Sequence, residues 1–279
     1  MTRFLSLSSG SNGNCYYIGN DKCGILIDVG IGGRTIKKRL AEAGISIADI
    51  DLILVSHDHF DHIKSLGTFT ERFGIPVYTT REIIISFEDH FCTRGYMNGH
   101  CHALRPEERA ELAMRDGKIS VTPFRVPHDA SDNVGYHIDF FGETFTFMTD
   151  IGSVTDAAVH YAALADHLIV ESNYDYDMLI NGPYEEELKL RIRDGHGHLS
   201  NDQTAELLQR ALSEADLSRV NPKDVFLCHL SENNNTPALA LRSARKALIE
   251  KTACLGIDCG KIRLEALPRR EASQIFTWG

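Results

Sequence analysis

Short apolar runs separated by polar turns dominate the first part of the chain. Such runs at the N-terminus, at residues 14–18 and at residues 24–29 predict strands. Residues 34–43 carry apolar side chains at helical spacing and precede Gly44, so we expect a helix that stops there. Residues 51–56, DLILVS, are almost continuously apolar, which is typical of a strand buried on both faces of a sheet.

The rest of the chain alternates between blocks of strands and helices. We expect further helices at residues 60–73, 184–193, 200–215 and 237–250. We expect further strands at residues 75–79, 119–126, 135–140, 144–149, 166–171, 225–228, 261–267 and 273–277. The consecutive strands between residues 119 and 149 predict an antiparallel meander, which argues against a doubly wound fold. The pattern therefore predicts an α/β protein in which two sheets pack face to face, with helices outside.

Residues 81–117 are irregular and contain His90, His100 and His102. We interpret the part around 85–117 as a lid-like insertion of helical segments over a cleft. These three histidines are left without a role, and we expect that none of them binds a metal directly. The remainder contains no repeat or linker, so residues 1–279 are predicted to form one domain.

The amino-acid composition indicates a protein with a large hydrophobic core in a reducing compartment. Hydrophobic residues make up 43% of the 279 residues, so a large core is available without disulfides. The seven cysteines are scattered and odd in number, which favours free thiols in a reducing compartment. No signal peptide or membrane-spanning run is present, so we expect a cytoplasmic protein without a membrane association.

The formal net charge of −10 argues against a protein that coats nucleic acid non-specifically, because such binding needs many Lys and Arg side chains. The small basic clusters at residues 34–39 and at Arg191 and Arg193 are typical of solvated helix faces. A local positive site built from bound cations remains compatible with this charge. No obligate protein partner is evident.

The densest chemical signal is SHDHFDH, residues 56–62, directly after the predicted buried strand. Three imidazoles and two carboxylates within one turn would be costly in a dry interior unless a cation accompanied them. Neutral imidazole and carboxylate ligands suit zinc, manganese or iron. Isolated histidines elsewhere, namely His137, His160 and His167, are expected to be structural or surface residues.

The pattern His57-x-His59-x-Asp61-His62 resembles the signature of the metallo-β-lactamase superfamily. Further matches follow in the order of that family: His128 in VPHDASD, Asp150 in FTFMTD and His229 in VFLCHLSENNN. The resemblance implies an αββα sandwich of two mixed sheets with helices outside.

The same resemblance implies two divalent metals per chain. One would be held by His57, His59 and His128 and the other by Asp61, His62 and His229, with Asp150 bridging them. Redox di-iron members carry Glu at the position of His59, so the resemblance favours zinc or manganese, with iron as a further option. A shared hydroxide between the metals would then attack the substrate.

Three polar loops provide the clues to the substrate. Ser200 and Gln203 form a capping box that starts a helix, and Thr236 followed by Pro237 starts another. Helix starts bind anions, although each motif is equally explained by ordinary capping. The loop SSGSNGN can likewise form an anion-binding nest or a simple tight turn. We predict contacts with a phosphate-bearing substrate from these loops, through Ser9, Ser11, Asn12, Asn14, Ser200, Asn201, Ser231, Asn233 and Asn234.

SSGSNGN, SHDHFDH, PHDASD, VESNYD, GHLSN and HLSENNNTP together resemble the YycJ-like (WalJ-like) exonuclease branch, which is related to ribonuclease Z-type nucleases. This branch implies a 5′-to-3′ exonuclease on single-stranded or 5′-phosphorylated DNA ends. It also implies that His198 donates a proton or hydrogen bond at the scissile phosphate, beside Asp61. Glu171 and Asn173 of VESNYD are expected to orient ligands or to act as loop caps. Hydrolysis of a thioester, lactone or lactam on the same centre is the alternative.

Overall fold

The computed structural model describes residues 1–215, 222–256 and 258–279, and two seven-stranded sheets form its centre. The first sheet has the strand order β14 (Phe276–Trp278), β1 (Thr2–Ser8), β2 (Cys15–Gly19), β3 (Gly24–Ile27), β4 (Ile50–Leu54), β5 (Val77–Thr80) and β6 (Cys101–Leu104). The second has the order β13 (Arg263–Ala266), β12 (Asp224–Cys228), β11 (His167–Glu171), β10 (Glu143–Met148), β9 (Val134–Phe140), β8 (Gly117–Arg125) and β7 (Ala110–Met114).

Both sheets are mixed, as predicted. In the first, β14 to β3 are antiparallel and β3 to β6 are parallel. In the second, β7 to β10 are antiparallel, which confirms the predicted meander, and β10 to β13 are parallel. The carboxyl ends of the parallel strands therefore point to the same end of each sheet.

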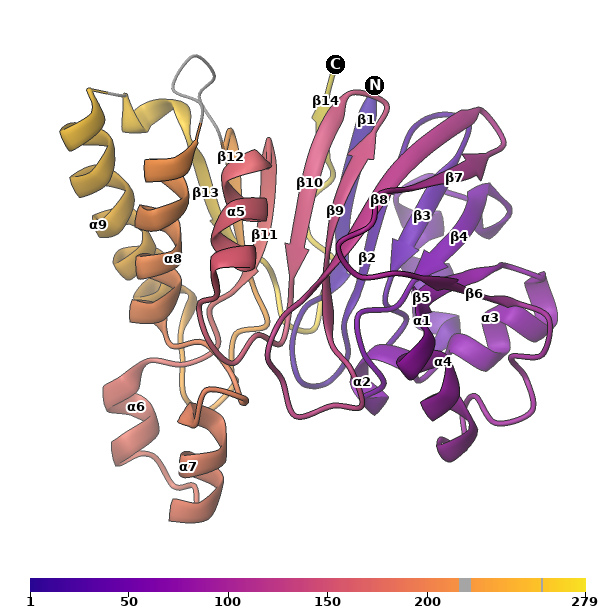
Figure 1. The fold of residues 1–279 in the computed structure, drawn as a ribbon, viewed down its shortest axis with the longest axis horizontal. Coiled ribbons are helices and arrows are strands. Elements are labelled where there is room, and N and C mark those ends of the chain that lie inside the picture. Colours follow the sequence, from indigo (N-terminus) through magenta and orange to yellow (C-terminus); the bar gives the residue numbers. More distant parts are fainter. Residues whose placement is uncertain (216–221, 257) are drawn as a thin grey trace.

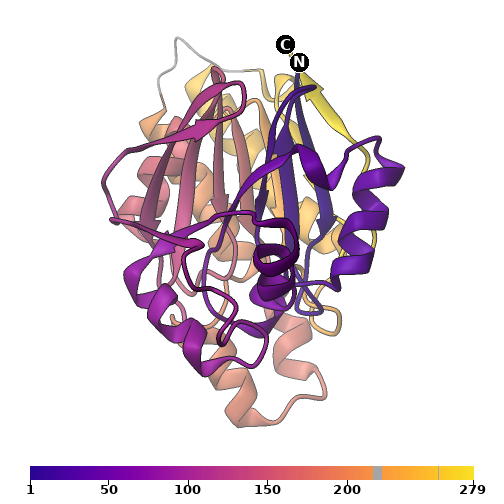
Figure 2. The same cartoon turned by 90° about the vertical axis from the view of Figure 1, so that its right-hand side faces the viewer.

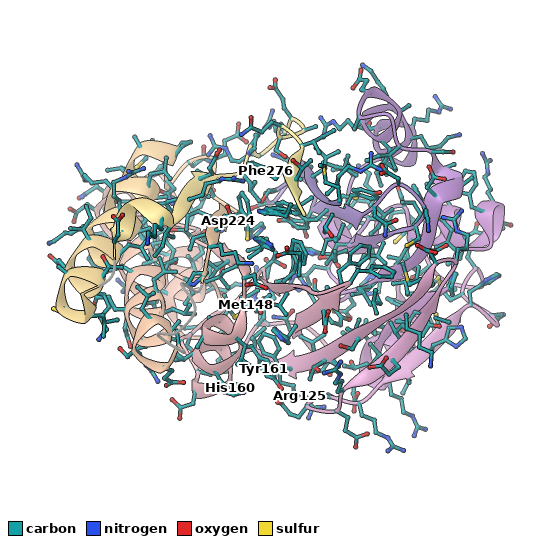
Figure 3. The ribbon with its side chains drawn as sticks, turned by 90° about the horizontal axis from the view of Figure 1, so that it is seen from above. Arg125, Met148, His160, Tyr161, Asp224 and Phe276 are labelled. Atoms are coloured by element: carbon teal, nitrogen blue, oxygen red, sulfur yellow. The ribbon has the colours of Figure 1, made fainter. Side chains whose placement is uncertain are left out.

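Aromatic side chains fill the space between the sheets. The ring of Phe4 lies 5.2 Å from that of Phe226 and 6.0 Å from that of Phe147. The C-terminal strand joins this core, because Phe276 packs 4.6 Å from Phe226. Seen from above, Phe276 and Asp224 lie near one another where the two sheets face each other (Figure 3).

Helices and short turns cover the outside of the sandwich (Figure 1). The helices are α1 (Gly33–Glu42), α2 (Phe60–Ile63), α3 (Leu66–Phe73), α4 (Arg81–Ser86), α5 (Asp156–Leu164), α6 (Tyr176–Asn181), α7 (Glu186–Arg193), α8 (Asn201–Glu214) and α9 (Pro237–Leu255). Three 3₁₀ turns accompany them: η1 (Ile47–Asp49), η2 (Phe87–Asp89) and η3 (Cys259–Lys261). Helices α5, α8 and α9 bury Ala162, Leu208 and Ala244 against the second sheet. Helices α6 and α7 project below the sandwich in both side views (Figure 2).

The structure corrects two predicted elements. The helix predicted at residues 60–73 is broken into α2 and α3 at Ser65, whose Oγ donates to the carbonyl of Ile31 at 2.6 Å. The lid-like insertion predicted around 85–117 contains β6 and β7, which extend the edges of the two sheets. The part between α4 and β6 and the short connections on either side of β7 lie outside the sheets. The alternation of apolar and polar residues in β7 (AELAM) extends over only five residues, so the sequence pattern did not indicate a strand there.

Candidate metal centre and active-site cavity

Four strand ends converge at one end of the sandwich and carry the predicted metal ligands. The turn after β4 carries His57 to His62, while His128, Asp150 and His229 follow β8, β10 and β12. Asp150 and His229 adopt left-handed backbone conformations, with φ of 52° and 51°. Such angles are uncommon outside glycine and persist where the surrounding structure enforces them, as happens at functional sites.

The donor atoms of these side chains form three compact groups. His57, His59 and His128 make one; Asp61, His62 and His229 make a second; and Asp150 joins His57 and His62 in a third. Within each group the ligating atoms lie within 4.8 Å of one another. The structure thus brings together the seven side chains that the family resemblance assigns to two metals, in the same two sets.

Hydrogen bonds on the far side of each ring fix how the imidazoles point. His57 Nδ1 donates to Ser56 Oγ at 3.0 Å, and His128 Nδ1 donates to the carbonyl of Gly197 at 2.8 Å. His59 is turned the other way, because its Nε2 lies 3.2 Å from the carbonyl of Asp129 and leaves Nδ1 facing the centre. A ligand whose second nitrogen is held in this manner keeps one tautomer and one orientation.

Asp28, which sequence reasoning missed, holds the ring of His62. Its Oδ2 accepts from His62 Nδ1 at 2.7 Å, and it also accepts from the Ser56 hydroxyl at 2.8 Å. Asp28 has a φ of 56° and is completely buried. The available signal was an Asp directly after an apolar strand, at the same relative position as Asp150 and His229.

The buried donor atoms of this site are better satisfied with a bound cation than without one. His57 Nε2 and His229 Nε2 are buried and have no hydrogen-bond partner among the described residues. A buried polar nitrogen without a partner is unfavourable, and a metal bond would remove that cost. Imidazoles and carboxylates in these two sets are also the ligands that zinc and manganese take.

The titration behaviour of His57 and Asp150 points the same way. Burial lowers the pKa of His57, and the nearby His62 lowers it further, so this ring is neutral as a metal ligand must be. Burial alone would raise the pKa of Asp150, but His229 and His62 hold it well below its usual range. The Asp150 carboxylate is therefore charged although it is buried. A buried negative charge needs positive charge nearby, either as protons on the neighbouring histidines or as divalent cations.

Glu171 links one ligand to a histidine in the cavity. Its Oε1 accepts from His229 Nδ1 at 2.7 Å and from His198 Nδ1 at 2.8 Å, while Oε2 accepts from two backbone amides. Burial would lower the pKa of His198, but the Glu171 carboxylate outweighs burial and raises it. Asn173 donates to the carbonyl of His229 at 2.8 Å, so both residues of the VESNYD motif support His229.

A cavity of about 320 Å³ opens over the ligands. Its polar side includes His59, Asp61, Asp150, His198 and His229. The opposite wall comes from the α6–α7 segment through Tyr184, Leu188, Arg191 and Ile192. Leu188 and Ile192 are four residues apart in α7 and so lie on one face of that helix, and Tyr184 precedes the helix.

The predicted substrate-contacting residues divide into three sets. Ser11 and Ser231 line the cavity. Asn12 and Asn233 are exposed and contact Glu232 and the Tyr184 hydroxyl. None of the other five lines the cavity. Internal hydrogen bonds occupy the buried side chains of Ser9, Asn14, Ser200 and Asn201. Asn234 is also buried, and its Oδ1 has no hydrogen-bond partner among the described residues.

The helix starts proposed as anion sites are occupied by their own caps. Ser200 accepts from the amide of Gln203 in the predicted capping box, and Thr236 accepts from the amide of Leu239. The alternative of ordinary capping therefore accounts for both motifs. The histidines left without a role, His90, His100 and His102, are outside every group of donor atoms found in the described residues.

Comparison with known proteins extends these observations to the whole chain. Residues 24–217 match the family model described as the β-lactamase superfamily domain. The chain is 30% identical over 256 residues to exodeoxyribonuclease WalJ of Streptococcus pneumoniae, covering 92% of this chain and 91% of that protein. It is 32% identical over 252 residues to exodeoxyribonuclease YycJ of Bacillus anthracis, covering 89% of each.

A solved structure shares the fold at low sequence identity. The metallo-β-lactamase fold protein YhfI from Bacillus subtilis superimposes with a TM-score of 0.68 and 16% identity, over 99% of this chain and 98% of that one. Among the described residues, no helix combines the length and the apolar character needed to cross a bilayer.

Proposed function

The chain belongs to the β-lactamase superfamily, and from this premise we propose that it is a metal-dependent exodeoxyribonuclease. One observation carries the proposal: two sets of metal-ligand donors and a carboxylate-held histidine share one cavity. Similarity to two exodeoxyribonucleases over about nine-tenths of the chain supports the substrate class. We further propose that the enzyme removes nucleotides from the 5′ end of single-stranded or 5′-phosphorylated DNA.

His57, His59 and His128 would hold one cation, Asp61, His62 and His229 the other, and Asp150 would lie between them. Zinc and manganese are the metals that we propose for this donor set. When bound, such cations activate water and polarise the phosphoryl oxygen. The protein's own contribution is to hold each ring in place through Ser56, Asp28, Gly197 and Glu171.

His198 is proposed as the proton donor. Its Nδ1 is held by Glu171, so Nε2 is the nitrogen left to meet a substrate in the cavity. The raised pKa favours the protonated imidazole, which a donor to a leaving oxygen requires. Asp61 lies partly exposed in the same cavity and would act through the second cation.

The site favours a nucleotide over a small carbonyl compound because a polar centre faces a wall with apolar side chains and a cation. Arg191 binds Asp129 through Nε and one terminal nitrogen, both at 2.5 Å. This pair fixes a guanidinium at the cavity edge, where a neighbouring phosphate can approach it. A reducing location such as the cytoplasm is also proposed, since the cysteines of the described residues are all free.

The test uses metal-loaded protein and single-stranded oligonucleotides labelled at either end. We expect mononucleotides to be released first from the 5′ end, and a thioester to be cleaved much more slowly. Cleavage of the thioester alone would overturn the proposal. Release from the 3′ end would retain the nuclease and correct its polarity.

A further inference from the structure

Two aromatic rings from separate segments meet in solvent beside the metal-binding turn. Phe60 lies between the ligands His59 and Asp61, and Phe91 follows η2. Phe60 is 43% exposed and Phe91 is 78% exposed, yet their ring centroids are only 5.4 Å apart. Exposed aromatic surface of this kind is unfavourable in water and marks interaction sites.

The segment that carries Phe91 is tied to the metal-binding turn. His90 Nε2 lies 3.5 Å from Oδ2 of Asp58, and the same oxygen accepts a hydrogen bond from the Ser131 hydroxyl at 2.5 Å. Asp58 is itself buried, so it is a fixed anchor. The contact keeps the ring of Phe91 next to Phe60.

A cation completes this surface. Lys64 Nζ lies 5.5 Å above the ring centroid of Phe60. Lys64 makes no ion pair in the described part of the chain, although Glu88 and Asp89 precede Phe91 in sequence. Two rings and an ammonium beside a centre for phosphodiester cleavage match a polyanion whose flat bases are free to stack.

We propose that Phe60, Phe91 and Lys64 form a stacking platform for the bases of single-stranded nucleic acid next to the cleaved end. This inference rests on the proposed function. A duplex keeps its bases within its own stack, so the platform selects single strands. Lys64 meets the backbone phosphates, and the rings stack on bases without regard to sequence. The platform supplies the local affinity that the acidic chain otherwise lacks.

The test measures binding without cleavage. Metal-loaded protein is titrated into a fluorescent single-stranded oligonucleotide whose phosphorothioate linkages resist cleavage, and anisotropy gives the dissociation constant. We expect Phe91→Ala to weaken binding by at least about fivefold, with Phe91→Trp restoring it, because each stacked base contributes substantially. Lys64→Gln is expected to weaken binding and to reduce its dependence on salt.

Phe141→Ala is the matched control, since Phe141 is 42% exposed, contacts the ring of Phe140 and lies in the β9–β10 turn, away from α2 (Figure 1). An oligonucleotide with abasic sites should bind wild type and Phe91→Ala alike. Equal binding of the normal oligonucleotide by wild type and Phe91→Ala would overturn the platform. The platform would also be overturned if Phe91→Ala weakened binding of the abasic oligonucleotide as much as it weakens binding of the normal one. A wild-type dimer that Phe91→Ala dissociates would likewise overturn it.

The readouts separate this inference from the proposed function. If metal-loaded wild type fails to cleave any oligonucleotide, the nuclease proposal fails whatever the binding result. If wild type cleaves and Phe91→Ala binds and cleaves as well as wild type, only the platform fails.

Discussion

His62 Nδ1 lies 2.7 Å from Oδ2 of Asp28, and neither side chain is exposed to solvent. The carboxylate reaches a metal-ligand ring from behind, and it is fixed in turn by the amide and hydroxyl of Ser56. Burial would lower the pKa of His62, but Asp150 and Asp28 raise it well above the usual value. Asp28 therefore fixes the orientation of this ring and, after Asp150, contributes to its raised pKa.

Asp28→Asn is expected to lower metal affinity by about 10–100-fold, because an amide is a weaker partner for the imidazole and also disturbs Ser56. Competition with a chromophoric chelator measures the effect. Asp116→Asn, on an exposed carboxylate paired with Lys22, is the control. An unchanged affinity in Asp28→Asn would show that the ring of His62 is held by its other contacts.

His198→Ala is expected to lower kcat by about 10²–10⁴-fold while metal content stays constant, because it removes the proposed proton donor and none of the seven proposed ligands. Steady-state cleavage of an oligonucleotide and metal analysis of the same samples test this. His196→Ala changes an exposed histidine of the same loop and should leave kcat unchanged. Equal rates for His198→Ala and wild type would remove His198 from the mechanism.

Gly30→Ala is expected to destabilise the protein by at least about 1–3 kcal/mol and to weaken metal binding, since overpacking forces the backbone to move. A Cβ on Gly30 would overlap the carbonyl of Asp61, which accepts from the amide of Asn14 at 2.8 Å. A Cβ on Gly32 would meet only the Thr35 hydroxyl at 3.8 Å, so Gly32→Ala is the control. Urea unfolding of both variants gives the comparison, and equal midpoints would contradict this reading of the turn.

His137 gives a prediction about pH that is independent of the metal centre. Burial lowers its pKa to about 4, whereas in the unfolded chain it is about 6.5. Between these values the unfolded state binds more protons, so stability falls as the pH drops from about 6.5 to 4. At pH 4.5 the loss from this group is roughly 2 kcal/mol after allowance for its partial exposure.

The measurement is urea unfolding of chelator-treated wild type and His137→Gln at pH 7 and pH 4.5. The variant should lose less stability than wild type over this interval. If both lose the same amount, His137 is protonated equally in the folded and unfolded states.

Only part of the proposed metal-ligand set is marked by local sequence. His57 to His62 form a dense cluster after an apolar strand, whereas His128, Asp150 and His229 follow strands singly and were assigned through the family resemblance. Asp28 has no such cluster, and its partner lies 34 positions away, so only the fold connects them. Metal-binding side chains are therefore easier to recognise in the sequence than the residues, such as Asp28, that orient those side chains by hydrogen bonds.

The remaining differences have physical causes. Helix α5 was missed because its small alanines are buried against α8 and leave no clear polar stripe. Ser9 and Asn201 looked like substrate contacts because polarity in a loop does not reveal whether its groups bond internally. Tyr184, Leu188 and Ile192 had a visible spacing of four, but nothing in the sequence indicates that this face meets the cavity.

The ligand turn after β4 belongs to the first sheet, while His128, Asp150 and His229 belong to the second. Each cation would consequently link ligands from both sheets and so hold the two halves of the sandwich together at this end. Neither half contains a complete centre, so a fragment with one sheet would carry only part of the ligand set for each cation. Stripping the metals should loosen the joint between the halves at this end, while the aromatic contacts among Phe4, Phe226 and Phe276 keep it closed farther along.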